Sequence, residues 1–150
     1  MIIVCSLSDH KNVCESVKAS HLISVIDPGF QPLTPKVIQK HLKLSFDDIV
    51  EFNKNNKIFR GSGLFNEQIL PNINHINKIV NFVSTWDQSH PIVIHCWCGV
   101  SRSMAVAASE PTLRQAGRGY RCVDAAAAAV ARATWQRPPG RWGDQTPIRF

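Results

Sequence analysis

Residues 91–103 read Pro-Ile-Val-Ile-His-Cys-Trp-Cys-Gly-Val-Ser-Arg-Ser, and this stretch decides the fold. The apolar β-branched run from Ile92 to Ile94 predicts a buried strand. Gly99 permits a tight turn after that strand, and a helix is expected from near Ser101 through Ala108. Strand, short loop and helix in this order predict one unit of a parallel α/β sheet.

The loop between this strand and this helix has the composition of an anion-binding site. Its backbone N–H groups and the start of the helix would surround an anion with partial positive charge. Arg102 can hold two phosphate oxygens with its planar fork. The same positive field lowers the pKa of a thiol, so Cys96 is the candidate nucleophile. Ligands of open α/β sheets bind at the carboxyl ends of strands, where this loop lies.

The sequence on the amino-terminal side supplies further strands and helices. Strands are expected at residues 2–5, 22–26 and 42–46. A helix is expected from Ser8 or Asp9 to about Val17, and residues 32–39 are expected to be a connector. Residues 51–70 are interpreted as a long loop, with Gly-Ser-Gly at 61–63 as a flexible connector and, less well supported, as a phosphate loop. A second helix is expected to begin near Pro71, with one apolar face formed by Ile73, Ile76, Val80 and Val83.

Strands that alternate with helices predict an α/β fold with a mostly parallel central sheet flanked by helices. The 150 residues and 44% hydrophobic content suit one compact domain. The net charge of +6 comes without a Lys/Arg-rich run interleaved with aromatics, so no nucleic-acid partner is expected. No membrane partner is expected either, because no signal peptide or membrane-length apolar run is evident.

The cysteines and histidines are irregularly spaced. Five cysteines form a poor disulfide framework, which favours a reducing, cytoplasmic location. The histidines outside residues 91–103 lack metal-ligand spacing, so no metal is expected. Cys98 is interpreted as a small side chain that fits the loop, although a strained disulfide with Cys96 is an alternative. The structural cysteines are expected to be Cys5, Cys14 and Cys122.

The composition changes after residue 108. Residues 1–108 contain eight Lys and two Arg, whereas residues 109–150 contain seven Arg and no Lys. We therefore divide the chain into a catalytic region, 1–108, and an atypical Arg/Ala/Pro-rich segment, 109–150. Two interpretations of this segment remain open: a capping helix near residues 124–133 with a loose tail, or a segment from a frameshift or fusion.

The segment from His95 to Ser103 resembles the His-Cys-x5-Arg-Ser signature of the protein tyrosine phosphatase superfamily. Over roughly residues 1–108 the chain is similar to small bacterial tyrosine or dual-specificity phosphatase-like proteins. The resemblance implies a phosphatase-like fold and hydrolysis of phosphorylated proteins or small phosphate esters without a cofactor. It also implies that a phosphocysteine forms at Cys96.

The resemblance assigns roles to the residues of the signature. Cys96 would be the nucleophile and Arg102 would bind the phosphoryl oxygens. His95 would orient the loop and tune the thiolate, and Ser103 would donate a hydrogen bond to the sulfur. The backbone amides that would line the phosphate site belong to Trp97, Cys98, Gly99, Val100, Ser101 and Arg102.

The general acid is less well defined by the sequence. We favour Asp48, which ends the strand expected at 42–46, with Asp47 as the alternative and Glu51 or Glu67 if neither serves. The loop at 51–70 makes the separation from Cys96 longer than in the family pattern. A different class of function also remains open: an inactive phosphate-binding module, or an unstable product of a disrupted reading frame.

Overall fold

The computed structural model describes residues 1–49, 55, 57–60, 63–65, 67–108 and 148–149. Their elements follow in the order β1 (Ile2–Ser6), α1 (His10–Ser16), β2 (His21–Ile26), β3 (Lys40–Ser45), β4 (Ile58–Arg60), β5 (Gly63–Phe65), α2 (Ile73–Ser84), β6 (Ile92–Cys96) and β7 (Ile148–Arg149). A further helical segment covers residues 102–108. The strands and helices expected in the first half of the chain are therefore present, with ends shifted by one or two residues.

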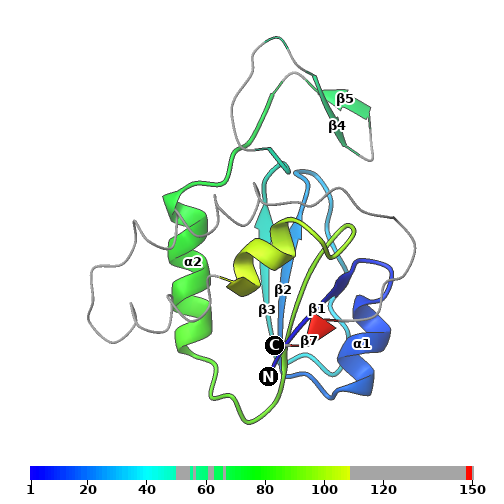
Figure 1. Cartoon of the computed structure of the whole chain (residues 1–150), viewed down its shortest axis with the longest axis vertical. Coiled ribbons are helices and arrows are strands. Elements are labelled where there is room, and N and C mark those ends of the chain that lie inside the picture. Colours follow the sequence, from blue (N-terminus) through cyan, green and yellow to red (C-terminus); the bar gives the residue numbers. More distant parts are fainter. Residues whose placement is uncertain (50–54, 56, 61–62, 66, 109–147, 150) are drawn as a thin grey trace.

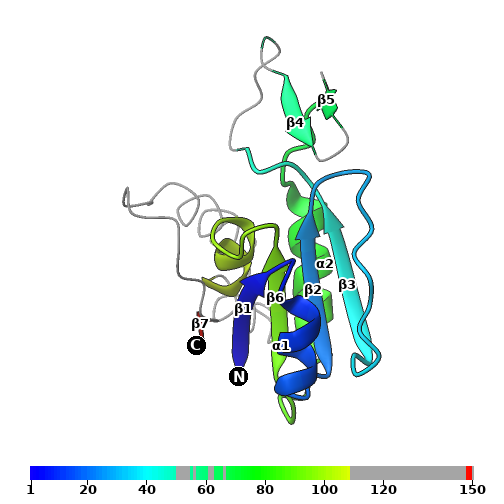
Figure 2. The same ribbon diagram turned by 90° about the vertical axis from the view of Figure 1, so that its right-hand side faces the viewer.

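The central sheet, drawn in Figures 1 and 2, has the strand order β3-β2-β6-β1-β7, which Figure 2 shows from right to left. β1, β2, β3 and β6 are mutually parallel where they pair, and only β7 runs antiparallel, beside β1. This confirms the α/β fold with a mostly parallel sheet. Because the parallel strands share a direction, their carboxyl ends lie at one edge of the sheet, where the loops after β1, β2, β3 and β6 meet.

Helices cover both faces of the sheet (Figure 2). On one face α1 packs through Val13 and Cys14 onto a cluster that includes Ile3, Leu22 and Val93. On the other face α2 and the 102–108 helix pack onto the strand residues Ile2, Val4, Ile23, Val25, Ile92 and Ile94. Strands buried on both faces need continuous apolar runs, which is why β1, β2 and β6 are so rich in Ile and Val.

The second helix begins later than expected and turns a different residue inward. Asn72 caps it by accepting from the backbone N–H groups of Asn74 and His75, and the His75 ring accepts in turn from the Asn72 N–H. Ile76, Ile79 and Val83 form its buried face, whereas Ile73 is 48% exposed. The expected face was wrong at Ile73, which lies in the first turn of the helix, and it omitted the buried Ile79.

Residues 51–70 are not the structureless loop expected from the sequence. They contain an antiparallel hairpin in which Ile58 pairs with Phe65 and Arg60 with Gly63. The sequence does contain a signal for this hairpin, because an apolar pair lies on each side of Gly-Ser, a common two-residue hairpin connection. The hairpin extends beyond the carboxyl edge of the central sheet (Figures 1 and 2).

Most of the atypical carboxyl-terminal segment lies outside the described residues, including the helix expected at 124–133. Its residues Ile148 and Arg149 form β7, beside β1. The division at residue 108 stays a prediction. In the part of the chain that is described, no helix is long and apolar enough to cross a bilayer.

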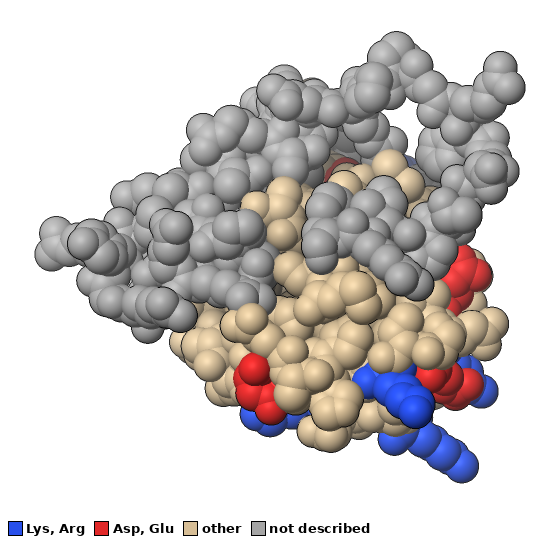
Figure 3. Space-filling view, turned by 60° about the horizontal axis from the view of Figure 1, so that its bottom comes forward, with Lys and Arg blue, Asp and Glu red and all other residues tan. Residues whose placement is uncertain are grey.

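On the face at the amino-terminal end of the sheet, charges of both signs are interspersed (Figure 3). Figure 3 shows the amino-terminal end of the sheet, where basic and acidic side chains occur close to one another among many uncharged ones. Within the described residues visible in that view, neither sign of charge forms an extended patch. A net positive charge spread in this way favours no polyanionic partner on that face.

Candidate active site

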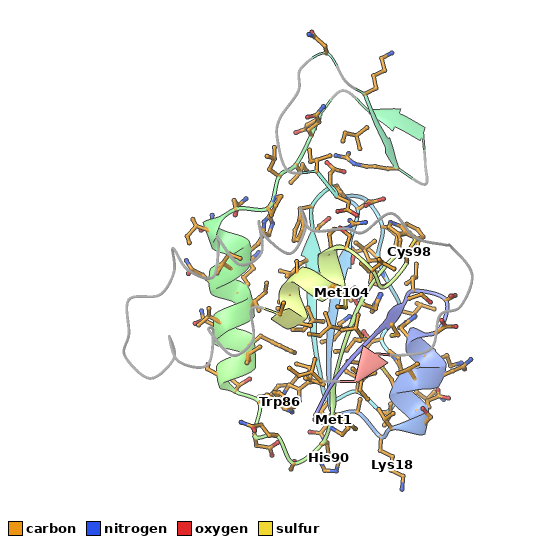
Figure 4. The ribbon with its side chains drawn as sticks, viewed as in Figure 1. Met1, Lys18, Trp86, His90, Cys98 and Met104 are labelled. Atoms are coloured by element: carbon orange, nitrogen blue, oxygen red, sulfur yellow. The ribbon has the colours of Figure 1, made fainter. Side chains whose placement is uncertain are left out.

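The loop after β6 forms a cradle at the carboxyl edge, closely packed against β1. The Leu7 N–H donates to the Trp97 carbonyl over 3.1 Å. Gly99 has a φ of +71°, and a Cβ there would lie 2.6 Å from the Cys5 carbonyl carbon. Only glycine therefore fits at this position. Cys98 lies at this end of the molecule, whereas Trp86 and His90 lie at the other (Figure 4).

Cys96 ends β6 and its side chain is buried at the floor of the cradle. Its Sγ lies 3.2 Å from the Ser103 hydroxyl oxygen. Burial alone would raise the pKa of the thiol, but hydrogen bonds from the Ser103 hydroxyl and from the Ser103 and Ser101 N–H groups oppose it, as does the charge of Arg102. The net effect places the pKa of Cys96 below its ordinary value, so the structure favours the nucleophilic thiolate.

Arg102 is buried beside the cysteine and is held by groups from two other strands. Its Nη1 donates to Asp27 Oδ1 over 2.6 Å and to the Phe46 carbonyl over 2.8 Å. Its buried Nε has no hydrogen-bond partner among the described residues. A buried guanidinium with an unpaired donor is costly unless an acceptor binds there, so the site is suited to an anion.

Asp27 is a site residue that the sequence analysis did not identify. It follows β2 and accepts from Arg102 through one oxygen and from the Trp97 indole Nε1 through the other, the latter over 2.8 Å. The Trp97 ring also packs against Phe30, with centroids 4.9 Å apart. Asp27 was identifiable in principle, because it is an acidic residue at the carboxyl end of a predicted strand of the parallel sheet.

The two candidate acids after β3 have different environments. Asp47 is buried and accepts from Arg60 twice, at 2.8 and 2.7 Å, and from the Ile69 N–H at 2.7 Å. Asp48 has 41% of its side chain exposed; one oxygen accepts from the Ser101 hydroxyl over 2.7 Å, and the other lies 3.9 Å from Arg102 Nε. Asp48 thus faces the cradle, whereas Asp47 faces the hairpin.

The pKa of Asp47 is lowered. Burial opposes this shift, but the hydrogen bonds from Arg60 and Ile69 outweigh it. A carboxyl held ionised by a buried guanidinium is a poor proton donor. Of the remaining candidates, Glu51 lies outside the described residues, and Glu67 is exposed and contacts Arg60 through its backbone carbonyl.

His95 connects the cradle to a chain of hydrogen bonds through the sheet. Its Nδ1 lies 3.4 Å from the Cys96 carbonyl, an acceptor, and must therefore carry the proton. Its Nε2 then accepts from the Ser24 hydroxyl at 2.6 Å, and Ser24 in turn lies 2.7 Å from His41 Nε2. Thr34 completes the chain at His41 Nδ1, over 2.7 Å. No role for His41 was predicted from the sequence, but it helps to fix the tautomer of His95.

His95 and His41, the two histidines in this series of hydrogen bonds, are uncharged at neutral pH. Burial is the main cause that lowers the pKa of His95 to about 3 and that of His41 to about 4. His95 therefore orients the loop as a neutral ring and adds no positive charge beside Cys96.

The remaining cysteines in the described residues are free thiols. Cys5 and Cys14 are buried, and burial raises the pKa of each to about 12, which makes them unreactive. Cys98 is exposed on the cradle while Cys96 is buried beneath it, and the two are not joined. Cys122 lies outside the described residues.

Comparison with known proteins supplies the family. The model of the protein-tyrosine phosphatase family matches residues 63–138, just over half of the 150 residues, and the match contains the whole cradle. The chain belongs to the protein-tyrosine phosphatase family. No curated protein matches it significantly.

Solved structures with a similar arrangement include the following three. The crystal structure of DUSP15 is 17% identical with a TM-score of 0.49, and the match covers 89% of this chain and 83% of that one. The tyrosine phosphatase OH1 from the Orf virus is 16% identical, with a TM-score of 0.47 and coverages of 88% and 68%. TcPTP1 of Trypanosoma cruzi is 12% identical, with a TM-score of 0.42 and coverages of 91% and 60%. Because these scores are below 0.5, family membership here depends on the matched segment.

Proposed function

We propose that this phosphatase-family chain hydrolyses aryl phosphate monoesters, with phosphotyrosine in proteins as the substrate class, through a phosphocysteine at Cys96. The observation that carries the proposal is the buried Cys96 thiol of lowered pKa beside Arg102, whose buried Nε has no hydrogen-bond partner among the described residues. A nucleophile and an unsatisfied anion donor at one site suit attack on a bound phosphoryl group.

In the first step the Cys96 thiolate attacks phosphorus and forms the S–P bond. The bond between phosphorus and the ester oxygen breaks, and its electron pair leaves with that oxygen. Asp48 gives the leaving oxygen a proton, a role supported by its exposed carboxyl at the cradle rim. Arg102 and the amides of residues 97–102 stabilise the charge on the equatorial phosphoryl oxygens.

In the second step water attacks the phosphocysteine. Asp48, now ionised, takes a proton from the water, and the S–P bond breaks with its electron pair on sulfur. The Ser103 hydroxyl, 3.2 Å from the sulfur, stabilises the departing thiolate. Inorganic phosphate leaves and Asp48 is again protonated for the next cycle.

An aromatic pair beside the cradle favours an aryl ester over an alkyl one. Phe30 is 40% exposed and packs against Trp97, which belongs to the cradle itself. An aromatic leaving group can pack against these rings, whereas a short serine side chain makes little contact. The proposed substrate class is therefore phosphotyrosine.

The test is turnover of p-nitrophenyl phosphate and of a phosphotyrosine peptide by the full chain. Activity should persist in a chelator and be inhibited by vanadate. The Cys96→Ser variant should lose turnover yet retain phosphopeptide binding, because the cradle remains while the nucleophile is lost. Binding of phosphopeptide without turnover by the wild-type chain would instead identify a phosphate-binding module.

A further inference from the structure

Three consecutive residues after β3 each contact a different part of the site. The Phe46 carbonyl accepts from Arg102, the Asp47 carboxylate accepts from Arg60, and the Asp48 carboxylate accepts from Ser101. The backbone here is therefore fixed on both sides, by the cradle and by the hairpin. The position of Asp48 depends on both sets of contacts.

The contact on the hairpin side is unusually complete for a charged pair. Asp47 is 1% exposed and Arg60 is 6% exposed. Two parallel N–H···O bonds join them, and Arg60 Nη2 also donates to the Glu67 carbonyl over 2.9 Å. Asp47 is joined to Ile69 twice more, through its N–H at 2.8 Å and through its carboxylate at 2.7 Å.

These bonds bring together the two ends of the excursion between residues 47 and 69. Asp47 lies where the chain leaves the sheet, and Ile69 lies where it returns toward α2. Arg60 comes from β4, inside the excursion, and reaches both ends. A paired charge so deeply buried is weak evidence for added stability, because its desolvation offsets most of the attraction. It does, however, specify one geometry.

We propose that the Arg60–Asp47 pair positions the general acid: it holds the residue 46–48 backbone so that the Asp48 carboxyl lies over the cradle. Arg60 and Asp47 are positioning residues and exchange no proton with substrate. The proposal rests on the proposed function and extends it to two residues that touch neither Cys96 nor the phosphate.

A direct consequence is that Asp47→Asn alone cannot show which aspartate is the acid. It would impair proton donation through the backbone of Asp48 even though Asp47 donates nothing. A substitution of Arg60 resolves the question, because it disturbs the backbone of Asp48 without removing a carboxyl group. The experiment therefore uses Arg60→Met, which keeps the aliphatic volume and removes the fork.

The measurement is the ratio of kcat/KM for p-nitrophenyl phosphate to kcat/KM for phenyl phosphate. The p-nitrophenolate ion leaves without a proton, so loss or misplacement of the acid raises this ratio. Asp48→Asn should raise it by about a hundredfold or more. Arg60→Met should raise it by about tenfold to a hundredfold, the effect of a small misplacement.

A double-mutant cycle separates positioning from general destabilisation. In the Asp48→Asn background Arg60→Met should change the ratio no further, because the group that it positions is already absent. A purely structural role would lower turnover of both substrates alike in both backgrounds. An unchanged ratio in the folded Arg60→Met chain overturns the proposal, as does an equal rise in both backgrounds.

A second variant covers the case in which Arg60→Met does not fold because Asp47 is left charged and buried. Asp47→Asn combined with Arg60→Met leaves no buried charge and keeps a side-chain oxygen for the Ile69 N–H. It should show the same raised ratio. Cys96-dependent turnover of p-nitrophenyl phosphate by the wild-type chain tests the proposed function separately, so failure of one does not imply failure of the other.

Discussion

The chemical properties of Cys96 and Arg102 depend on the groups that contact each of them directly. Cys96 is buried, which by itself favours the neutral thiol, and hydrogen bonds reverse that preference. Arg102 is buried, and Asp27 and Phe46 bond its Nη1, while its Nε has no hydrogen-bond partner in the described part of the chain. The arrangement is ready for a phosphoryl group before one binds, which is the condition for electrostatic stabilisation of a transition state.

Removing the Ser103 hydroxyl should raise the pKa of Cys96. Ser103→Ala deletes one hydrogen bond to the thiolate, worth about one pKa unit for a bond to a charged group. Alkylation by iodoacetamide measured across pH gives this value directly. Ser101→Ala is the matched control, since its hydroxyl faces Asp48 and its backbone N–H toward the sulfur is kept. Equal shifts in both variants would contradict the role given to the Ser103 hydroxyl.

Arg102→Lys should reduce kcat/KM for aryl phosphates by about a hundredfold or more, the usual effect of losing one such donor group. A single ammonium cannot bond Asp27, Phe46 and two phosphoryl oxygens in the fixed fork geometry of a guanidinium. Steady-state kinetics check this, with circular dichroism to verify the fold. Activity within threefold or so of the wild type would show that the fork is not required.

At the scale of elements, the cradle depends on β1 as much as on β6. The closest approach is at Gly99, where a Cβ would overlap the backbone between Cys5 and Ser6. The loop cannot shift outward without breaking the bond from the Leu7 N–H to the Trp97 carbonyl. The first strand of the chain therefore supports the shape of the phosphate site.

Gly99→Ala should accordingly abolish most activity and lower the free energy of unfolding. Gly29→Ala is the matched control: Gly29 also has positive φ, +87°, but nothing lies within 4 Å of its added Cβ. Gly29→Ala should cost only the conformational strain, about 1–2 kcal/mol, and Gly99→Ala should cost more because β1 must move. Urea denaturation measures both, and similar losses would argue against the steric account.

The sequence predicts a helix or strand best where a single apolar face or one continuous apolar run determines it. The strands β1, β2 and β6 and the cradle were predictable, since continuous β-branched runs and the spacing of Cys96, Gly99 and Arg102 are local signals. The hairpin at 58–65 was missed because its strands are only three residues each. The Arg60–Asp47 pair and the contacts of Asp27 with Arg102 and Trp97 were missed because they join positions far apart in the sequence, which no periodic pattern reveals.

At the scale of the whole molecule, polar groups run through the sheet from one side of the cradle to the β2–β3 connector. Ser24 lies fully buried between His95 and His41, and His10 stacks on His95 with ring centroids 4.7 Å apart. A polar chain inside an apolar sheet is tolerated only when every member is bonded. These hydrogen-bonded groups meet that condition only while His95 and His41 are both neutral.

The chain should therefore lose stability in mild acid, between about pH 6.5 and pH 4. In the native state the pKa of His95 is about 3 and that of His41 about 4, whereas both lie near 6.5 in an unfolded chain. Below pH 6.5 the unfolded state binds protons that the native state does not. The stabilisation is thus complete above pH 6.5 and falls as the pH falls toward the native values, with a slope of at most about 1.4 kcal/mol per pH unit for the fully buried His95.

Urea unfolding at a series of pH values measures this slope, and a substitution shows how much of it comes from His41. His41→Gln should make the slope shallower, although by less than the limit for His95, because His41 is only half-buried and solvent screens its charge. A free energy of unfolding that stays constant from pH 7 to pH 5 would mean that His95 and His41 accept protons without disrupting the fold. The hydrogen-bonded chain would then not require their neutral forms.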